Sequence, residues 1–157
     1  MTTYNIKIVS QTNAIVLIII LLTIFIGGIV LFIPQGVSKP FSILLMLVSM
    51  TIAYFLWQRF VTARTEWTID NSGINMTWIK QFPFNHKDDL TLKWNEIESI
   101  KRGFDPNYYS LKIKLVTGQK IKFYHDTLTT RDDFDQFIKT LNQTFVTERH
   151  SQQKVWQ

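Results

Sequence analysis

The sequence contains no cysteine, and this absence removes several classes of structure and chemistry. Disulfide bridges, thiolate nucleophiles and cysteine-ligated zinc or iron–sulfur sites are all excluded. The absence also argues against a small secreted module held together by disulfides. The fold must therefore rest on hydrophobic burial, and the function must need no thiol.

Charge is almost absent from one long part of the chain. Residues 14–57 contain a single charged side chain, Lys39, whereas all 12 acidic residues follow residue 57. All but two of the 17 basic residues also follow it, and the formal net charge is +5. The mean hydropathy of +0.04 averages over these two parts. This division indicates that the two parts lie in two different solvents.

Two apolar runs predict a transmembrane helical hairpin over residues 13–61. The first, Ala14–Ile33, has 20 uncharged residues, and a helix of that length spans about 30 Å, the thickness of the hydrocarbon core. The second, Phe41–Trp57, has 17 residues and is extended to residue 60 by side chains that snorkel to the interface. The linker Pro34–Pro40 holds two prolines and a glycine, so it interrupts both helices and makes them antiparallel neighbours.

Two other interpretations of these runs fit less well. A cleaved signal peptide has a shorter apolar region and a small-residue cleavage site, which Pro34–Val37 does not provide. A buried pair of core helices would need a much larger soluble protein around it than the rest of this chain supplies.

Basic residues near the helix ends predict a multi-pass protein of the plasma (inner) membrane with both termini in the cytoplasm. Lys7 lies on the terminal side, whereas the linker offers Lys39 alone. The absence of ionisable residues inside either run disfavours transport. The residues expected at the membrane interface are Tyr54, Trp57, Arg59 and Arg64.

Alternating segments predict a strand-rich soluble domain over residues 62–147, followed by a polar tail at 148–157. The predicted strands at the start of this domain are Glu66–Asp70, Ile74–Lys80, Leu90–Trp94 and Ile97–Lys101. Residues 1–12 form an N-terminal cytoplasmic segment in which Tyr4, Ile6 and Ile8 alternate with other residues. If both termini share a side, this segment can add an edge strand to the sheet; the alternative is an unstructured leader.

The clearest hairpin joins Tyr108–Val116 to Lys120–Tyr124. A three-residue loop, Val116–Gly118, with Gly118 in the left-handed conformation pairs Ile113 with Ile121. A two-residue loop would place apolar residues opposite charged ones. The pattern therefore predicts one register.

A C-terminal amphipathic helix follows the hairpin. Its apolar residues recur at helical spacing and form one stripe: Phe134, Phe137, Ile138, Leu141 and Phe145. Thr129 or Thr130 can cap this helix, and Asp132 and Asp133 suit its first turn. The stripe must be buried against the strands.

The order of these elements carries a family resemblance. Ser72–Ile74 followed by Trp94–Ile100 resembles the GI…WxxIxxI pattern of bacterial pleckstrin-homology-like (PH-like) domains that often follow a two-helix anchor, as in YcxB-like proteins. The resemblance covers residues 4–146, and its motifs mostly mark core positions. It implies an α+β fold in which the membrane hairpin precedes a partly open antiparallel barrel capped by one C-terminal helix. It implies no agreed activity.

The residues that carry chemistry form no catalytic or metal-binding pattern. His86, His125 and His150 lie far apart and lack metal-ligand spacing. No glycine-rich phosphate loop and no G-x-S-x-G motif is present. We therefore expect no enzyme activity, no metal and no cofactor.

One basic cluster is the candidate binding site. In the predicted register, Lys112 lies opposite Lys122 and Lys114 opposite Lys120, all on the face away from Ile113. Opposed like charges are destabilising, so the cluster suggests an anionic partner such as lipid headgroups. The alternative is a solvated sheet face neutralised by acidic residues of a neighbouring strand, Glu96 and Glu98. Nucleic acid is disfavoured because only Tyr124 could stack a base on this face.

These observations predict a non-enzymatic, membrane-anchored PH-like module that acts by binding. A protein partner is the first expectation and the anionic leaflet the second. One alternative is an accessory structural subunit of a membrane complex. Another is a lipid-modifying enzyme at the membrane surface, for which His125 would have to lie beside two carboxylates in a pocket.

Overall fold

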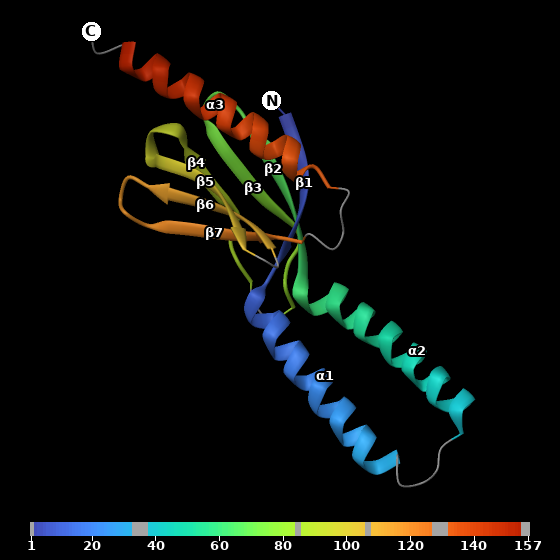
Figure 1. Cartoon of the computed structure of the whole chain (residues 1–157). Helices are drawn as coiled ribbons and strands as arrows, with labels where there is room; N and C mark the ends of the chain where they lie inside the picture. Colours follow the sequence, from blue (N-terminus) through green and yellow to red (C-terminus); the bar gives the residue numbers. More distant parts are fainter. Residues whose placement is uncertain (1, 33–37, 84–85, 106–107, 127–131, 155–157) are drawn as a thin grey trace. The chain divides into compact units, whose positions relative to one another are not determined.

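The chain folds into two compact units. The computed structural model describes residues 2–32, 38–83, 86–105, 108–126 and 132–154. One unit is helical and comprises Ser10–Thr62, and the other combines Met1–Val9 with Ala63–Gln157. The second unit is therefore discontinuous in sequence, because the helical unit is inserted into it (Figure 1).

The helical unit contains α1, Gln11–Phe32, and α2, Lys39–Leu56, which continues into the π-helical turn η2, Trp57–Val61. Two stretches, Gln11–Gly28 and Pro40–Val61, are long and apolar enough to cross a membrane. Only 11% and 0% of these stretches, respectively, is buried, whereas the core helix of a soluble protein is mostly buried. The prediction of two long apolar helices is confirmed.

Polar side chains within these helices are satisfied locally. The hydroxyls of Thr23, Ser49 and Thr51 each donate to the carbonyl four residues earlier, at 2.9, 2.8 and 2.9 Å. Such bonds leave no hydroxyl proton that needs water as its acceptor. The apolar surface of the two helices is therefore not interrupted by unpaired donors at these positions.

The other unit is built on one antiparallel sheet of seven strands. Their bounds are β1 Thr2–Val9, β2 Thr62–Ile69, β3 Gly73–Lys80, β4 Leu90–Lys93, β5 Ile97–Asp105, β6 Tyr108–Leu115 and β7 Lys120–His125. The strands follow the order β4-β3-β2-β1-β7-β6-β5. Helix α3, Phe134–Lys154, packs against this sheet.

The N-terminal segment is a strand, but it does not lie at an edge. β1 lies between β2 and β7, and Tyr4, Ile6 and Ile8 are all at most 4% exposed. Burial on the core side explains the alternation seen in the sequence. The eight residues before the helical unit thus supply a central strand of the sheet.

The chain turns sharply between β4 and β5. A short 3₁₀ turn, η3 (Trp94–Glu96), ends β4 earlier than the sequence predicted. The buried Trp94 donates its indole N–H to the Asp70 carbonyl at 3.0 Å, which ties the turn to the end of β2. Gly73 is required nearby, because a Cβ there would lie 2.0 Å from the Leu92 carbonyl oxygen.

The β6–β7 hairpin has the predicted register. Ile113 pairs with Ile121, and Gly118 has a φ of 88°, in the left-handed region. Leu115 N–H donates to the Gln119 carbonyl at 2.8 Å, which closes the three-residue loop. The apolar residues of both strands therefore share the core face.

The apolar stripe of α3 completes the core. Phe134, Phe137, Ile138 and Leu141 are at most 5% exposed, and Phe145 packs against the same cluster. Trp67 lies at the centre, with its ring centroid 5.0 Å from that of Phe137 and 5.0 Å from that of Phe123. The predicted stripe is confirmed.

The bounds of this helix differ from the prediction. α3 begins at Phe134, so Asp132 and Asp133 precede it, and the proposed caps Thr129 and Thr130 lie outside the described residues. At the other end α3 continues to Lys154, into the predicted polar tail. Good helix formers such as Glu, Arg, Gln and Lys can continue a helix without an apolar face. The loss of apolar periodicity after Phe145 therefore did not mark the end of the helix.

Candidate functional site

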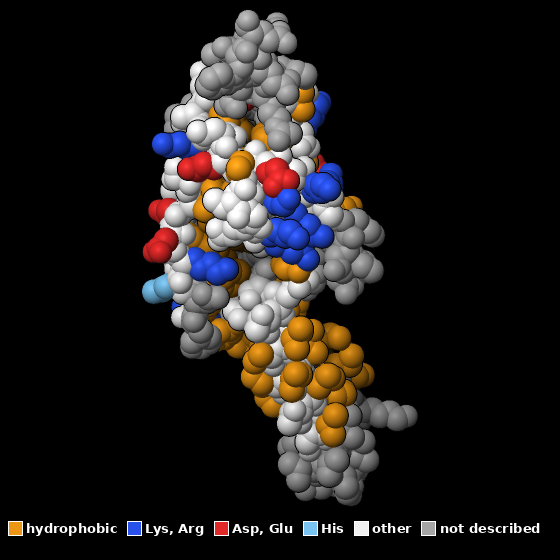
Figure 2. Space-filling model, turned by 90° about the vertical axis from the view of Figure 1, so that its left-hand side faces the viewer, with side chains coloured by type: hydrophobic (Ala, Val, Ile, Leu, Met, Phe, Trp, Pro, Cys, Tyr) orange, Lys and Arg blue, Asp and Glu red, His pale blue; other side chains and the backbone are white. Residues whose placement is uncertain are grey.

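The candidate site is the outer face of β5, β6 and β7, which we call the lysine face. In addition to the four predicted lysines, it holds Lys101, which pairs across from Lys112. The residues of the lysine face are Lys101, Lys112, Lys114, Lys120 and Lys122. Lys122 lies across from Lys112 on the other side, so three ammonium groups follow one cross-strand row. Figure 2 shows a group of basic side chains on the right of this unit, with further basic side chains on its left.

One lysine of this face has an acidic partner. Lys114 Nζ lies 2.6 Å from the Glu98 carboxylate, as the solvated-face interpretation expects. Glu96 does not reach the lysines, because its carboxylate accepts the Lys93 backbone N–H at 3.0 Å. Within the part of the chain that the structure describes, no ion pair involves the other four lysines. Most of the positive charge on the lysine face is therefore uncompensated.

Two of these lysines turn toward a neighbouring row of small and polar residues. Gly103, Ser110 and Tyr124 pair across β5, β6 and β7. A Cβ built on Gly103 would lie 3.6 Å from Lys112 Nζ and 2.5 Å from Ser110 Oγ, so the Lys112 ammonium occupies the space beside the glycine. Lys122 Nζ donates to the Tyr124 hydroxyl and lies 4.1 Å from the centroid of its ring. The Lys112 ammonium thus lies toward β5, and the Lys122 ammonium lies on Tyr124 of β7.

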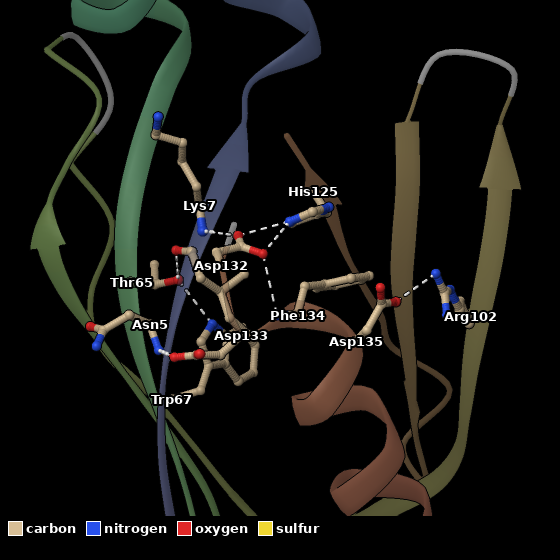
Figure 3. Close-up of polar contacts among 11 residues, drawn as sticks. Asn5, Lys7, Thr65, Trp67, Arg102, His125, Asp132, Asp133, Phe134 and Asp135 are labelled. Carbon is tan, nitrogen blue, oxygen red and sulfur yellow. Dashed lines mark hydrogen bonds and ion pairs between the residues drawn. The ribbon is translucent and has the colours of Figure 1, made fainter. Parts of the chain in front are cut away.

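A second polar cluster joins β7 to the start of α3. His125 Nε2 lies 2.8 and 2.7 Å from the two carboxylate oxygens of Asp132, and the imidazole stacks on Phe134 with centroids 4.2 Å apart (Figure 3). The His125 side chain is 8% exposed, and its Nδ1 is buried with no hydrogen-bond partner among the described residues. The imidazole hydrogen-bonds one carboxylate, whereas the enzyme alternative required two.

The acidic residues before α3 fasten the helix to β1. Asp132 accepts the Lys7 backbone N–H at 3.0 Å, and Asp133 accepts that of Asn5 at 2.9 Å (Figure 3). β7 pairs with β1 only at Ile8 and Val9, at the end of β1. The backbone amides of Asn5 and Lys7 therefore have no partner in β7. The carboxylates replace the missing strand contacts, which makes this cluster a structural junction.

The environment of Asp132 favours its charged form. Burial alone would raise the pKa of this carboxyl, but hydrogen bonds from His125, the Lys7 amide and the Phe134 amide, with the charge of His125, lower the pKa below its ordinary value of 3.8. Asp132 therefore stays ionised at neutral pH while mostly buried. Its hydrogen-bond partners are the reason that it can do so.

The residues predicted at a membrane interface lie at or just after the end of α2. Tyr54 is 58% exposed, and Arg59 is exposed on η2. Trp57 is half-buried, and its indole N–H is buried with no acceptor among the described residues. Arg64 lies in β2, where it pairs across from Lys80. Their role at an interface stays a prediction.

Sequence reasoning missed two features of these sites. Lys101 could have been found by extending the β6 register to β5, but a bulge between Ile97 and Ser99 shifts that pairing. The contact of His125 with Asp132 gave no signal in the sequence, because His125 ends a strand and Asp132 precedes a helix, so no single period relates them. Among the described residues, no group of three or more histidine and acidic side chains could hold a metal ion.

Comparison with known proteins adds no assignment. The chain matches no protein-family model, no curated protein and no solved structure. Its function must be argued from its own residues.

Proposed function

We propose that this protein is a membrane-anchored binding module of PH-like fold, without enzymatic activity, whose lysine face binds the anionic headgroups of a bilayer. The lysine face carries the proposal. Four of its five lysines have no acidic partner in the described chain, and three of them stand in one row. A sheet face that was only solvated would gain from interspersed acidic residues.

The two apolar helices support the anchor. Each is long enough to cross the hydrocarbon core, and their exposed surface is apolar along most of its length. Lys7 precedes the first apolar stretch, and Arg59 lies near the end of the second, on the side of the termini, which favours a plasma-membrane protein with both termini in the cytoplasm. An anchored domain meets headgroups at a high effective concentration, so weak contacts suffice for binding.

Seven antiparallel strands followed by one packed helix support the PH-like assignment. The residues of the family pattern shape the sheet and its core, as expected for motifs that mark core positions. Gly73 permits the close approach of β4 to β3, and Trp94 and Ile97 are buried in the core. The assignment describes the scaffold, and the binding argument rests on the lysine face.

The proposal is tested with the full chain, because β1 belongs to the unit built on the sheet, Met1–Val9 with Ala63–Gln157, which we call the soluble unit. The chain is placed in zwitterionic nanodiscs and mixed with vesicles that contain phosphatidylglycerol, and co-flotation is measured. We expect co-flotation at low salt and its loss at high salt, where surface charges are screened. Zwitterionic vesicles should not bind.

A matched pair of triple variants assigns the binding to the lysine face. Each Lys near an anionic surface contributes ~1 kcal/mol, so Lys101, Lys112 and Lys122 replaced by Gln should weaken binding by about two orders of magnitude. Replacing Lys87, Lys93 and Lys139 by Gln removes the same charge from exposed positions outside the face and should have little effect. Equal effects of the two variants, or no co-flotation of the native chain, would contradict leaflet binding and leave a protein partner or a larger complex as the function of the anchored module.

A further inference from the structure

We infer that the lysine face recognises the density of negative charge in a leaflet, without preference for one headgroup, and that Glu98 sets the density at which it binds. This inference rests on the proposed function and specifies which membranes the anchored module selects. A surface that recognises one headgroup needs several donors that converge on a single ligand. A surface that recognises charge density needs charges spread over an area that several lipids occupy.

The lysines of this face are spread over three strands. Lys101, Lys112 and Lys122 stand in one row across β5, β6 and β7, and neighbouring strands lie about 4.8 Å apart. The Lys112 ammonium lies beside Gly103 of β5, whereas the Lys122 ammonium lies on Tyr124 of β7. These two charges turn toward opposite strands instead of toward a common point. Each lysine is therefore placed to meet a headgroup of its own.

Glu98 is an acidic residue in direct contact with this face. It lies in a β-bulge of β5, where the pairing with β6 shifts between Ile97 and Ser99, and bulges change the direction of side chains. The Glu98 carboxylate lies 2.6 Å from Lys114 Nζ, and the side chains of Lys114 and Glu98 are 40% and 42% exposed. The ion pair is therefore accessible to an approaching headgroup.

This ion pair removes one positive charge from the lysine face. A headgroup that approaches Lys114 must compete with a carboxylate already in contact, and the negative charge of Glu98 repels anionic headgroups nearby. Without that carboxylate, all five lysines of the face would be uncompensated by acidic residues of the described chain, instead of four. Each additional positive charge near an anionic surface strengthens binding by a similar factor. Glu98 therefore raises the charge density that a leaflet needs for binding.

The first experiment varies the leaflet. The full chain in zwitterionic nanodiscs is floated with vesicles that contain phosphatidylglycerol or phosphatidylserine at several mole fractions. Both headgroups carry one net negative charge but differ in chemistry, so the two series should give dissociation constants within about twofold of each other. Because several lysines must each meet an anionic headgroup, doubling the anionic fraction should strengthen binding roughly tenfold.

The second experiment varies the ion pair at a fixed anionic fraction. Glu98→Gln should strengthen binding about fivefold, and Lys114→Gln should weaken it by a similar factor, because each changes the charge of the face by one unit. The double variant loses both charges and should bind within about twofold of the native chain. Its recovery relative to Lys114→Gln separates the effect of charge from a loss of folded structure. The control is Asp88→Asn, which removes a negative charge from an exposed position outside the face and should have little effect.

The possible outcomes separate this inference from the proposed function. A preference of more than about twofold for one headgroup, or binding that rises only in proportion to the anionic fraction, would overturn the recognition of charge density while leaflet binding stands. An unchanged or weaker affinity of Glu98→Gln, an equal gain in Asp88→Asn, or a double variant as weak as Lys114→Gln would overturn the role of Glu98. Absence of co-flotation with every anionic vesicle would overturn both the inference and the proposed function.

Discussion

At the scale of single residues, Asp132 links β1, the end of β7 and the start of α3. It is a mostly buried carboxylate that accepts hydrogen bonds from His125, Lys7 and Phe134. Removing the charge leaves these donors with a weaker acceptor, so Asp132→Asn should lower the free energy of unfolding of the soluble unit by about 1–3 kcal/mol. The measurement is urea unfolding in nanodiscs, followed by tryptophan fluorescence.

The pH dependence of this difference follows from the lowered pKa. A carboxyl whose folded pKa lies below its unfolded value contributes stability above the unfolded value and loses it as the pH falls through the folded pKa. The gap between the native chain and Asp132→Asn should therefore be full near neutral pH and shrink below about pH 4. The control is Asp135→Asn at the exposed ion pair with Arg102, where the side chain of Asp135 is 81% exposed and a small effect is expected. A gap that persists at low pH would contradict the role of the Asp132 charge.

The sequence indicated that acidic residues lie near the start of α3, but it did not indicate what they contact. Asp132 and Asp133 were predicted as part of the first helical turn because acids are favoured there. In the structure they precede the helix and bind the β1 amides of Asn5 and Lys7. That contact joins residues more than 120 positions apart, and no local pattern encodes it.

At the scale of elements, the β6–β7 hairpin is the part that local rules predict best. Period-two alternation and one glycine in the loop determine the register, because any slip would expose the apolar residues. Gly118 carries this role with a φ of 88°, and nothing lies within 4 Å of an added Cβ. Gly118→Ala should therefore cost about 1 kcal/mol through backbone strain alone, since a side chain disfavours the left-handed conformation.

The hairpin prediction is checked by urea unfolding and by amide hydrogen exchange at β6 and β7. Val116→Ala is the control, because Val116 is 65% exposed in the same loop. Faster exchange limited to the two strands of the hairpin is the expected pattern for Gly118→Ala. An unchanged or increased free energy of unfolding would show that the left-handed residue does not control the turn.

At the scale of the whole molecule, the sequence was misleading about where the soluble domain begins. A contiguous domain over residues 62–147 was expected because charge and strand patterning resume there. The structure makes that domain discontinuous, with Thr2–Val9 as the strand between β2 and β7. A short alternating segment before a long apolar run is equally typical of a leader or an edge strand, so its central place could emerge only from tertiary packing.

The last prediction tests this discontinuity. Deleting residues 2–9 removes four buried core side chains, Tyr4, Ile6, Ile8 and Val9, and the amides that bind Asp132 and Asp133. Burial of each large apolar side chain contributes about 1.5–3 kcal/mol, and a small domain is stable by only about 5–15 kcal/mol. The deletion should therefore unfold the soluble unit, seen as rapid proteolysis after residue 62.

A variant with the same eight residues in an order that breaks the alternation should behave like the deletion. In both variants the helical unit should remain in the membrane after carbonate washing, because its apolar stretches are intact. A protease-resistant soluble unit in the deletion variant would show that β1 is dispensable for the fold.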